Sequence, residues 1–315
     1  MTVDQQSLWQ RLLSAKKPAL LTHRNPDADT LGSALALYHA LERCGVRAVL
    51  VACELPLAPK FHFLPGIERF KAAVPKGCDL LVAIDSGDAK LLIPDRPDVE
   101  MIVIDHHESN RRYGSINLVR PECGATAEVV ADLLEAGGVK LNAKIAAALY
   151  AALASDTRFF TTDRVGAGTF RRAAQLLEAG ADAEAIGNAL ARNRSMAELR
   201  LTGRLLSAMA LHGNGRIAAA AVTRADLAAC GAELADTADL PELLLSAVTA
   251  EAAVLVVELP GGRVKGSLRA KGALNVSHIA ARFGGGGHPK AAGFALEGEA
   301  QRVMQEAIAL MANAL

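Results

Sequence analysis

MIVIDHH, residues 101–107, is an apolar run that ends in one carboxylate and two imidazoles, and it decides the fold. A run of Val and Ile without polar alternation is typical of a strand buried on both faces, as in parallel α/β sheets. In such sheets ligands bind outside the carboxyl ends of the strands. Polar groups crowded at a strand end are costly unless something pairs or coordinates them. The stretch therefore predicts a parallel sheet with a functional site at its carboxyl edge.

Three other apolar segments end in the same way: LLTHRNPDAD (residues 20–29), LLVAIDSGD (80–88) and AALASDT (151–157). Short apolar runs alternate with helical patterns in this part of the chain, which predicts an α/β domain with a mainly parallel sheet flanked by helices. We expect strands over residues 19–23, 47–53, 80–85 and 101–105, and helices over 31–44, 124–136 and 142–155.

The second part of the chain has a different pattern, which begins after a polar, Arg-rich helical stretch. A strand is expected over 215–223 and a hairpin over 252–270, followed by a helix near 275–283 and a terminal helix from Glu299. At 315 residues the chain is long enough for two domains. We expect a catalytic domain over residues 1–183, a helical linker over 184–213 and a smaller α/β substrate-binding domain over 214–315.

The composition excludes several classes of protein. Lys and Arg total 34, as do Asp and Glu, and a net charge of zero argues against a bulk nucleic-acid coat. The hydrophobic share of 51% argues against disorder. Five cysteines without a C-x-x-C pair suit a reducing cytosol. Because neither a signal-peptide pattern nor an apolar run of about 18 residues is visible, we expect a cytoplasmic protein without a membrane span.

The polar strand ends offer the donors of a two-metal centre. His23, Asp27 and Asp29 share one loop, where carboxylates at i and i+2 can face two different ions. Asp85 can bridge two ions, and Asp156 ends an apolar helix. Oxygen and imidazole donors without thiolate favour Mn²⁺ or Mg²⁺ over structural zinc. Two ions about 3.5–4 Å apart would polarise a phosphoryl oxygen and activate water.

A simpler interpretation of each aspartate is a helix N-cap. Asp27 or Asp29 could cap the helix expected near Leu31. We favour the metal centre because four separate segments deliver His or Asp to the same sheet edge. The remaining histidines that lack such neighbours are expected to be structural or surface residues: His39, His62, His212 and His278.

These motifs resemble those of the DHH phosphoesterase family. HRNPDADTLGS (residues 23–33) and the strand ends at 85, 105–107 and 156 occur in the family's order, and GSLRAKGALNVSHIAARFGGGGHPKAAGF (266–294) is similar to the DHH-associated domain. The resemblance implies that one ion is held by His23, Asp27 and Asp85, and the other by Asp29, Asp85, His106 and Asp156. It further implies that Asp105 supports a ligand and that His107, catalytic together with Asp85, lies near the scissile phosphate.

The second half contains a concentrated cationic segment. Residues 261–290 hold six basic side chains and no Asp or Glu. A glycine run lets backbone N–H groups approach an anion closely. The resemblance implies that a nucleotide is held by Arg269, Gly284, Gly285, Gly286, Gly287 and His288.

The resemblance implies a phosphodiesterase with two divalent ions, Mn²⁺ being favoured and Mg²⁺ or Co²⁺ the alternatives. Aromatic residues are only 4% of the chain, which disfavours the long stacking track of a processive nuclease. We therefore expect hydrolysis of very short oligoribonucleotides to mononucleotides, and removal of the 3′-phosphate of adenosine 3′,5′-bisphosphate. Cyclic di-AMP or pApA hydrolysis, a non-catalytic nucleotide sensor and a pyrophosphatase are the alternatives. A homodimer is also implied, whereas substrate length, polarity and sugar preference stay open.

Overall fold

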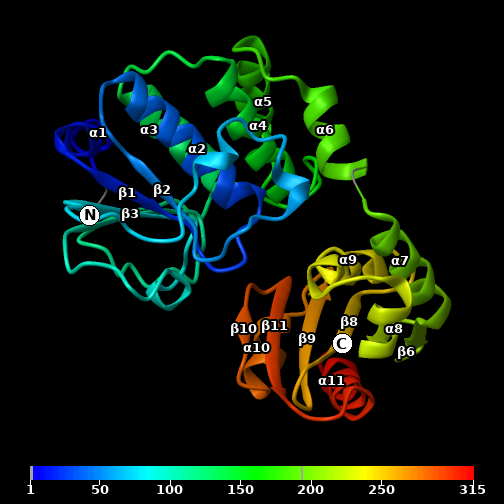
Figure 1. Ribbon diagram of the computed structural model, residues 1–315. Coiled ribbons are helices and arrows are strands. Elements are labelled where there is room, and N and C mark those ends of the chain that lie inside the picture. Colours follow the sequence, from blue (N-terminus) through cyan, green and yellow to red (C-terminus); the bar gives the residue numbers. More distant parts are fainter. Residues whose placement is uncertain (1–2, 193) are drawn as a thin grey trace. The chain divides into compact units, whose positions relative to one another are not determined.

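The protein folds into two compact units, residues 1–193 and 194–315 (Figure 1). The structure, a computed structural model, describes residues 3–192 and 194–315. Residues 1–2 of the predicted catalytic domain and residue 193 of the predicted linker lie outside the described residues. Among the described residues, no helix combines the length and apolar character needed to span a membrane.

The first unit is built on a five-stranded sheet in which all strands run parallel, as the sequence predicts. The strand order is β2-β1-β3-β4-β5. The chain therefore adds β2 on one side of β1 and the later strands on the other side, beginning with β3. The half-buried edge strand β5, with the sequence INLV, was not predicted. The strands are β1 (Pro18–Leu21), β2 (Val49–Val51), β3 (Leu80–Ile84), β4 (Met101–Asp105) and β5 (Ile116–Val119).

Helices cover one face of this sheet and loops cover the other (Figure 1). Leu20, Val82 and Ile104 pack into the core formed with the helices. Leu21 and Ala83 pack instead against loop residues, so both faces of the strands are buried. The helices are α1 (Gln5–Ser14), α2 (Ala28–Arg43), α3 (Thr126–Ala136), α4 (Ala143–Asp156), α5 (Ala167–Glu178) and α6 (Ala183–Arg192), with short 3₁₀ turns η1 (Pro59–Phe61), η2 (Ile67–Arg69) and η3 (Ala89–Leu91).

The pair α2 and α4 brings two of the predicted site segments together. A Cβ at Gly32 of α2 would lie 2.4 Å from the Ala148 carbonyl oxygen of α4, so only glycine permits this approach. The closely packed helices place the first turn of α2 near the last turn of α4, which ends at Asp156.

The second unit is a six-stranded mixed sheet of order β10-β11-β9-β8-β7-β6. The predicted hairpin is confirmed: β8 and β9 pair in antiparallel fashion around Gly261 and Gly262, whose φ angles are 74° and 71°. The strands are β6 (Ala210–His212), β7 (Ile217–Val222), β8 (Ala252–Leu259), β9 (Arg263–Ala270), β10 (Gly286–Gly287) and β11 (Ala291–Glu297). The helices are α7 (Met196–Ala208), α8 (Arg224–Cys230), η4 (Leu234–Thr237), α9 (Leu240–Leu245), α10 (Val276–Arg282) and α11 (Ala300–Ala314).

The two faces of this second sheet are covered by different helices. Val254 and Val256 of β8 pack with α10 and α11. Leu255 and Val257 pack with α7, α8 and α9. The stretch predicted as a helical linker contains two helices, of which α6 belongs to the first unit and α7 to the second. Its last residues are not helical, because Ala210–His212 form the edge strand β6, which pairs with β7.

Candidate metal centre

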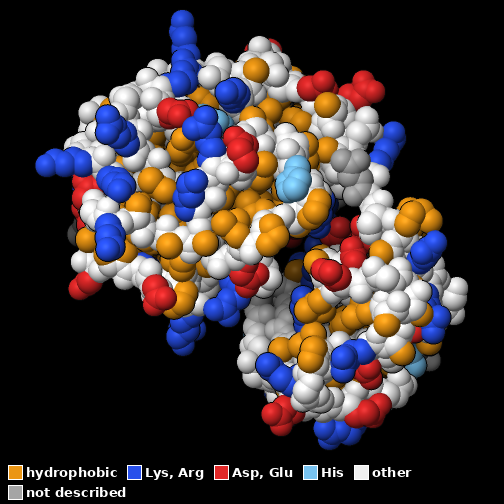
Figure 2. Space-filling view, viewed as in Figure 1, with side chains coloured by type: hydrophobic (Ala, Val, Ile, Leu, Met, Phe, Trp, Pro, Cys, Tyr) orange, Lys and Arg blue, Asp and Glu red, His pale blue; other side chains and the backbone are white. Residues whose placement is uncertain are grey.

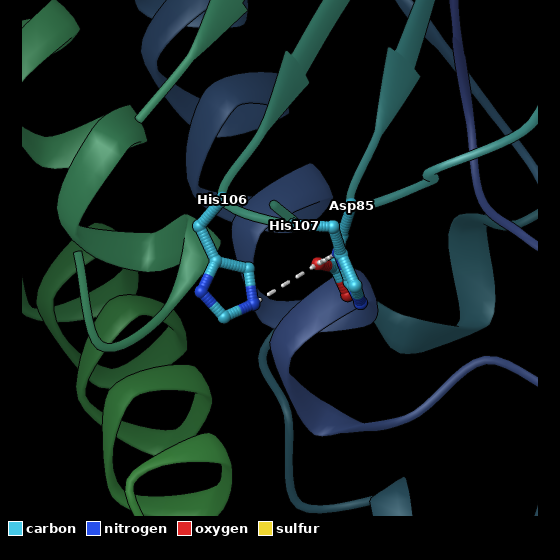
Figure 3. Close-up of side chains that lie close together, drawn as sticks. All are labelled: Asp85, His106 and His107. Atoms are coloured by element: carbon cyan, nitrogen blue, oxygen red, sulfur yellow. Dashed lines mark ion pairs between the residues drawn. The ribbon is translucent and has the colours of Figure 1, made fainter. Parts of the chain in front are cut away.

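Polar side chains from the ends of β1, β3, β4 and α4 meet at the carboxyl edge of the first sheet. Figure 3 shows His106 and His107, which follow β4, turned toward Asp85, which follows the neighbouring strand β3. The strand order switches from one side of β1 to the other between β1 and β3. Open α/β sheets bind ligands in the crevice at such a switch point. The topology therefore places the predicted site where a parallel sheet offers a ligand crevice.

Asp27 is both the N-cap of α2 and a member of this group. Its Oδ1 accepts a hydrogen bond from the backbone N–H of Thr30 (3.0 Å) and lies 3.2 Å from the Thr30 hydroxyl oxygen. This cap starts the helix at Ala28, three residues earlier than the predicted start at residue 31. The Thr30 hydroxyl donates to Asp85 Oδ2 (2.7 Å) and lies 2.5 Å from His23 Nε2. Asp27 therefore caps α2 and contributes a carboxylate to the site at the same time.

Asp29 is buried at the N-terminus of a second helix. Its carboxylate accepts the backbone N–H groups of Thr126 (2.7 Å) and Ala127 (3.0 Å), which begin α3. The positive end of the helix dipole favours an anion there. Even so, burial and the neighbouring carboxylates raise the pKa of Asp29 well above its ordinary value. A bound cation would relieve this repulsion.

Asp85 lies at the centre of the group. It is 2% exposed and adopts a φ of 57°, a conformation uncommon for a residue other than glycine. The hydroxyls of Thr30 and Thr126 donate to its two oxygens, at 2.7 and 2.8 Å. Burial acts to raise the pKa of Asp85, but the three neighbouring imidazoles outweigh it and hold the pKa below its ordinary range.

His106 presents one ring nitrogen to the carboxylates. Its Nδ1 lies 3.2 Å from the Cys123 carbonyl oxygen, which fixes the ring and points Nε2 at the site. Nε2 is 3.3 Å from Asp156 Oδ2, 3.8 Å from Asp85 Oδ1 and 4.0 Å from Asp29 Oδ2. Burial and neighbouring carboxylates raise the pKa of Asp156 to about 6.

His107 pairs with the buried carboxylate of Asp105. Its Nδ1 lies 2.6 Å from Asp105 Oδ1. Burial acts to lower the pKa of His107, but its hydrogen bond to Asp105 and the charges of neighbouring carboxylates raise it to about 9. His23 behaves in the same way: its attraction to Asp85 and Asp27 outweighs burial and raises its pKa to about 9.

The donor atoms form three groups, each within 4.8 Å: His23, Asp27 and Asp85; Asp29, His106 and Asp156; and Asp85, His106 and His107. All donors are carboxylate oxygens or imidazole nitrogens, which suit Mn²⁺ and Mg²⁺. Several carboxylates gathered in a buried edge are electrostatically unfavourable alone, so the residues fit a site for divalent cations. The structure thus brings together all six predicted ligands, from four chain segments.

The predicted substrate residues lie in the second unit. Every second residue of β9 points to the same face of the sheet, and this face carries Lys265, Ser267 and Arg269. Arg269 Nε lies 3.4 Å from Glu242 Oε2 of α9. The glycine run, residues 284–287, packs closely against β11. A Cβ at Gly285 would lie 2.2 Å from the Gly293 carbonyl oxygen, so this contact requires glycine. Gly286 and Gly287 pair with β11, and the His288 backbone N–H donates to the Ala291 carbonyl oxygen (2.8 Å).

Several residues that contact the site were not predicted. Thr30 and Thr126 donate to Asp85, and Asn110 donates to Asp105. Threonine and asparagine carry no metal-ligand signature, so spacing could not identify them. The single signal for Thr126 is its place at the start of a predicted helix.

The fold and the donor set define a metal-dependent phosphoesterase. Residues 18–153 match the DHH family, N-terminal domain, and residues 214–315 match the DHHA1 domain. The chain belongs to the DHH phosphoesterase family, which confirms the resemblance seen in its motifs.

Relatives of the chain include two kinds of nucleotide phosphodiesterase. It is 34% identical to the bifunctional oligoribonuclease and PAP phosphatase NrnA of Thermus thermophilus, covering 89% of this chain and 84% of that protein. It is 28% identical to the cyclic-di-AMP phosphodiesterase GdpP of Geobacillus thermodenitrificans, covering 96% of this chain and 48% of that protein. The crystal structure of an exopolyphosphatase-related protein from Bacteroides fragilis shares the fold, with a TM-score of 0.90, 22% identity and coverage of 98% and 96%.

Proposed function

We propose that this protein is a Mn²⁺-dependent phosphodiesterase that hydrolyses very short oligoribonucleotides to mononucleotides and also removes the 3′-phosphate of adenosine 3′,5′-bisphosphate. The observation that carries the proposal is that the metal-capable groups are linked: Asp85 belongs to two of the three groups and His106 belongs to two, as expected for two neighbouring ions. A relative at 34% identity is named for both activities.

In this proposal the predicted ligand sets hold the ions. Two bound ions would polarise a phosphoryl oxygen and activate water at neutral pH, so no Ser or Cys nucleophile is needed. Asp85 takes part in both sets, and its hydrogen bonds with Thr30 and Thr126 fix its two oxygens in different directions. One ion is assigned to His23, Asp27 and Asp85, and the other to Asp29, Asp85, His106 and Asp156.

His107 is proposed to act on the phosphate. Asp105 holds the proton of its Nδ1 and keeps the ring in one orientation. A cationic imidazole beside the scissile phosphate would stabilise the charge that develops in the transition state. Asp105 is assigned a supporting role because its carboxylate is fully buried and receives its bonds from His106, His107 and Asn110.

The second unit is proposed to bind a nucleotide of the substrate. Arg269 and Lys265 share one face of β9. Lys265 is exposed, but partial desolvation of its ammonium group by the surrounding protein and the charge of Arg269 lower its pKa. Two cations that repel each other in this way favour a bound anion. On the face viewed in Figure 2, basic side chains are scattered and not gathered into one patch. The glycine run and His288 are proposed to complete the contact with the bound anion.

Incubation of the protein with Mn²⁺ and labelled oligoribonucleotides of two to five nucleotides tests the proposal. We expect release of mononucleotides, with the shortest substrates cleaved fastest. The absence of mononucleotide release from every member of the series would contradict it.

Hydrolysis of cyclic di-AMP is the second candidate. The observation in its favour is the 28% identity to GdpP over 96% of this chain. A direct comparison of cyclic di-AMP with linear pApA separates the two activities. We expect faster turnover of the linear dinucleotide, and the reverse order would favour the second candidate.

We propose a cytoplasmic location, and the free thiols of the five cysteines support it because they suit a reducing compartment. A homodimer stays a prediction.

A further inference from the structure

Asp105 is the group through which His107 is held. Its Oδ1 accepts the backbone N–H groups of His106 (2.7 Å) and His107 (3.1 Å) together with the His107 Nδ1 (2.6 Å). Its Oδ2 accepts the side-chain amide of Asn110 (2.5 Å). Asn110 therefore fixes the second oxygen of this fully buried carboxylate, whose first oxygen holds the imidazole.

The Asn110 carboxamide fits in one orientation only. Its Nδ2 donates to Asp105 Oδ2 and to the Ser86 carbonyl oxygen (3.1 Å) at the end of β3. Its Oδ1 accepts the backbone N–H of Arg112 (2.6 Å). A reversed amide would set oxygen against two acceptors and nitrogen against a donor. Asn110 also closes the turn after β4, because its backbone N–H donates to the His107 carbonyl oxygen (3.1 Å).

Two carboxylates compete for the same imidazole nitrogen. His107 Nδ1 lies 2.6 Å from Asp105 Oδ1 and 3.4 Å from Asp85 Oδ1. The Nδ1 proton makes one strong hydrogen bond, so a small rotation of the Asp105 carboxylate would favour Asp85. That rotation would occupy an oxygen of the residue that two of the metal-capable groups share.

We propose that Asn110 is a positioning residue for the phosphodiesterase reaction: by fixing Asp105 against the end of β3, it keeps His107 paired with Asp105 and leaves Asp85 available to the metal centre. The kinetic part of this inference rests on the proposed function. The role requires an amide, because an aspartate at this position would place a carboxylate against Asp105 and against the Ser86 carbonyl oxygen.

The variants Asn110→Ala and Asn110→Asp test the role in the full-length, Mn²⁺-loaded protein. We expect kcat on a diribonucleotide to fall by about 10- to 100-fold, as for other residues that orient a side chain at a metal site, with KM almost unchanged. The matched control is Asn117→Ala. The Asn117 amide pairs with the backbone of Gly114 (3.0 and 2.7 Å), so its loss removes a similar turn contact and should leave kcat unchanged.

A double-mutant cycle separates positioning from general stabilisation. In a His107→Ala background, Asn110→Ala should cause no further loss of kcat, because the asparagine acts through that imidazole. An equal loss in both backgrounds would overturn the proposal.

A spectroscopic readout keeps this test independent of turnover. The chain has eight histidines, so selective ¹⁵N-histidine labelling gives few ring signals, and the His107→Ala variant assigns that of residue 107. In the Mg²⁺-loaded protein, where no paramagnetic Mn²⁺ broadens the ring signals, we expect a hydrogen-bonded Nδ1–H signal in the wild type and in Asn117→Ala that is shifted or lost in Asn110→Ala. An unchanged signal would overturn the proposal. A wild-type protein that shows the signal but cleaves no substrate would contradict the proposed function alone.

Discussion

The carboxyl edge of the first sheet and the basic face of β9 in the second unit are organised differently. At the first, Asp29 and Asp85 are 1% and 2% exposed, and their oxygens accept bonds from α2 and α3. On the second, the Arg269 side chain is 22% exposed and pairs with Glu242 of a short helix. The difference is the one expected if a buried network fixes the proposed chemistry and the proposed recognition uses side chains that can adapt to a ligand.

The largest expected effect comes from the centre of the buried network. Asp85→Asn keeps the shape of the side chain, and Asn tolerates the positive φ of this position. It removes a charge that both proposed ions need, so kcat should fall by more than about 100-fold, beyond the usual cost of a supporting group. The exposed Asp95→Asn serves as control, with circular dichroism to verify folding. Retained turnover in Asp85→Asn would show that the bridging assignment is wrong.

The pH dependence of the free energy of unfolding tests the same network without substrate. In the metal-free protein, neighbouring carboxylates outweigh burial and raise the pKa of His23 and His107 to about 9. A histidine whose pKa is raised in the folded protein stabilises the fold fully at pH values below its unfolded pKa of about 6.5. This contribution is lost as the pH rises toward the folded pKa of about 9. We expect the free energy of unfolding to fall by a few kcal/mol across this window.

Urea unfolding at the two ends of the window measures this change. Mn²⁺ should restore the stability at high pH, because the cation takes the place of the imidazole protons. The double variant His23→Gln/His107→Gln should show a flat profile. A flat profile in the wild type would contradict the expected coupling between imidazoles and carboxylates.

A smaller effect is expected on the basic face of β9. Arg269→Ala should raise KM for a diribonucleotide by about 10-fold with little change in kcat, because it removes binding without touching the reacting phosphate. Arg263→Ala, an exposed arginine on the same strand, is the matched control. An unchanged KM in Arg269→Ala would remove this residue from the substrate site.

The smallest effect concerns the glycine run. A Cβ at Gly285 would lie 2.2 Å from a backbone oxygen, whereas a Cβ at Gly286 meets nothing within 4 Å. We expect Gly285→Ala to lower the free energy of unfolding by about 1–3 kcal/mol, and Gly286→Ala to change it by less than about 0.5 kcal/mol. Thermal unfolding of the two variants measures the difference, and equal midpoints would show that packing against β11 does not select the glycine.

Much of the fold could be predicted because its signals are local. Apolar runs without alternation identified β1, β3 and β4 as buried parallel strands, and the Pro260–Gly262 turn identified the β8–β9 hairpin. The strands β5, β6, β10 and β11 were missed. β10 has only two residues, both glycines, and β5 is a half-buried edge strand, so neither shows the alternating or continuous apolar pattern of a strand.

The sequence by itself determined the donor types of the candidate centre, because His and Asp at the ends of apolar runs must meet at one edge of a parallel sheet. The tertiary structure alone decided which groups hold those donors. The hydroxyls of Thr30 and Thr126 and the amide of Asn110 reach the site only after strands and helices distant in sequence have packed. Their bonds depend on positions to within an ångström, and sequence spacing carries no information at that scale.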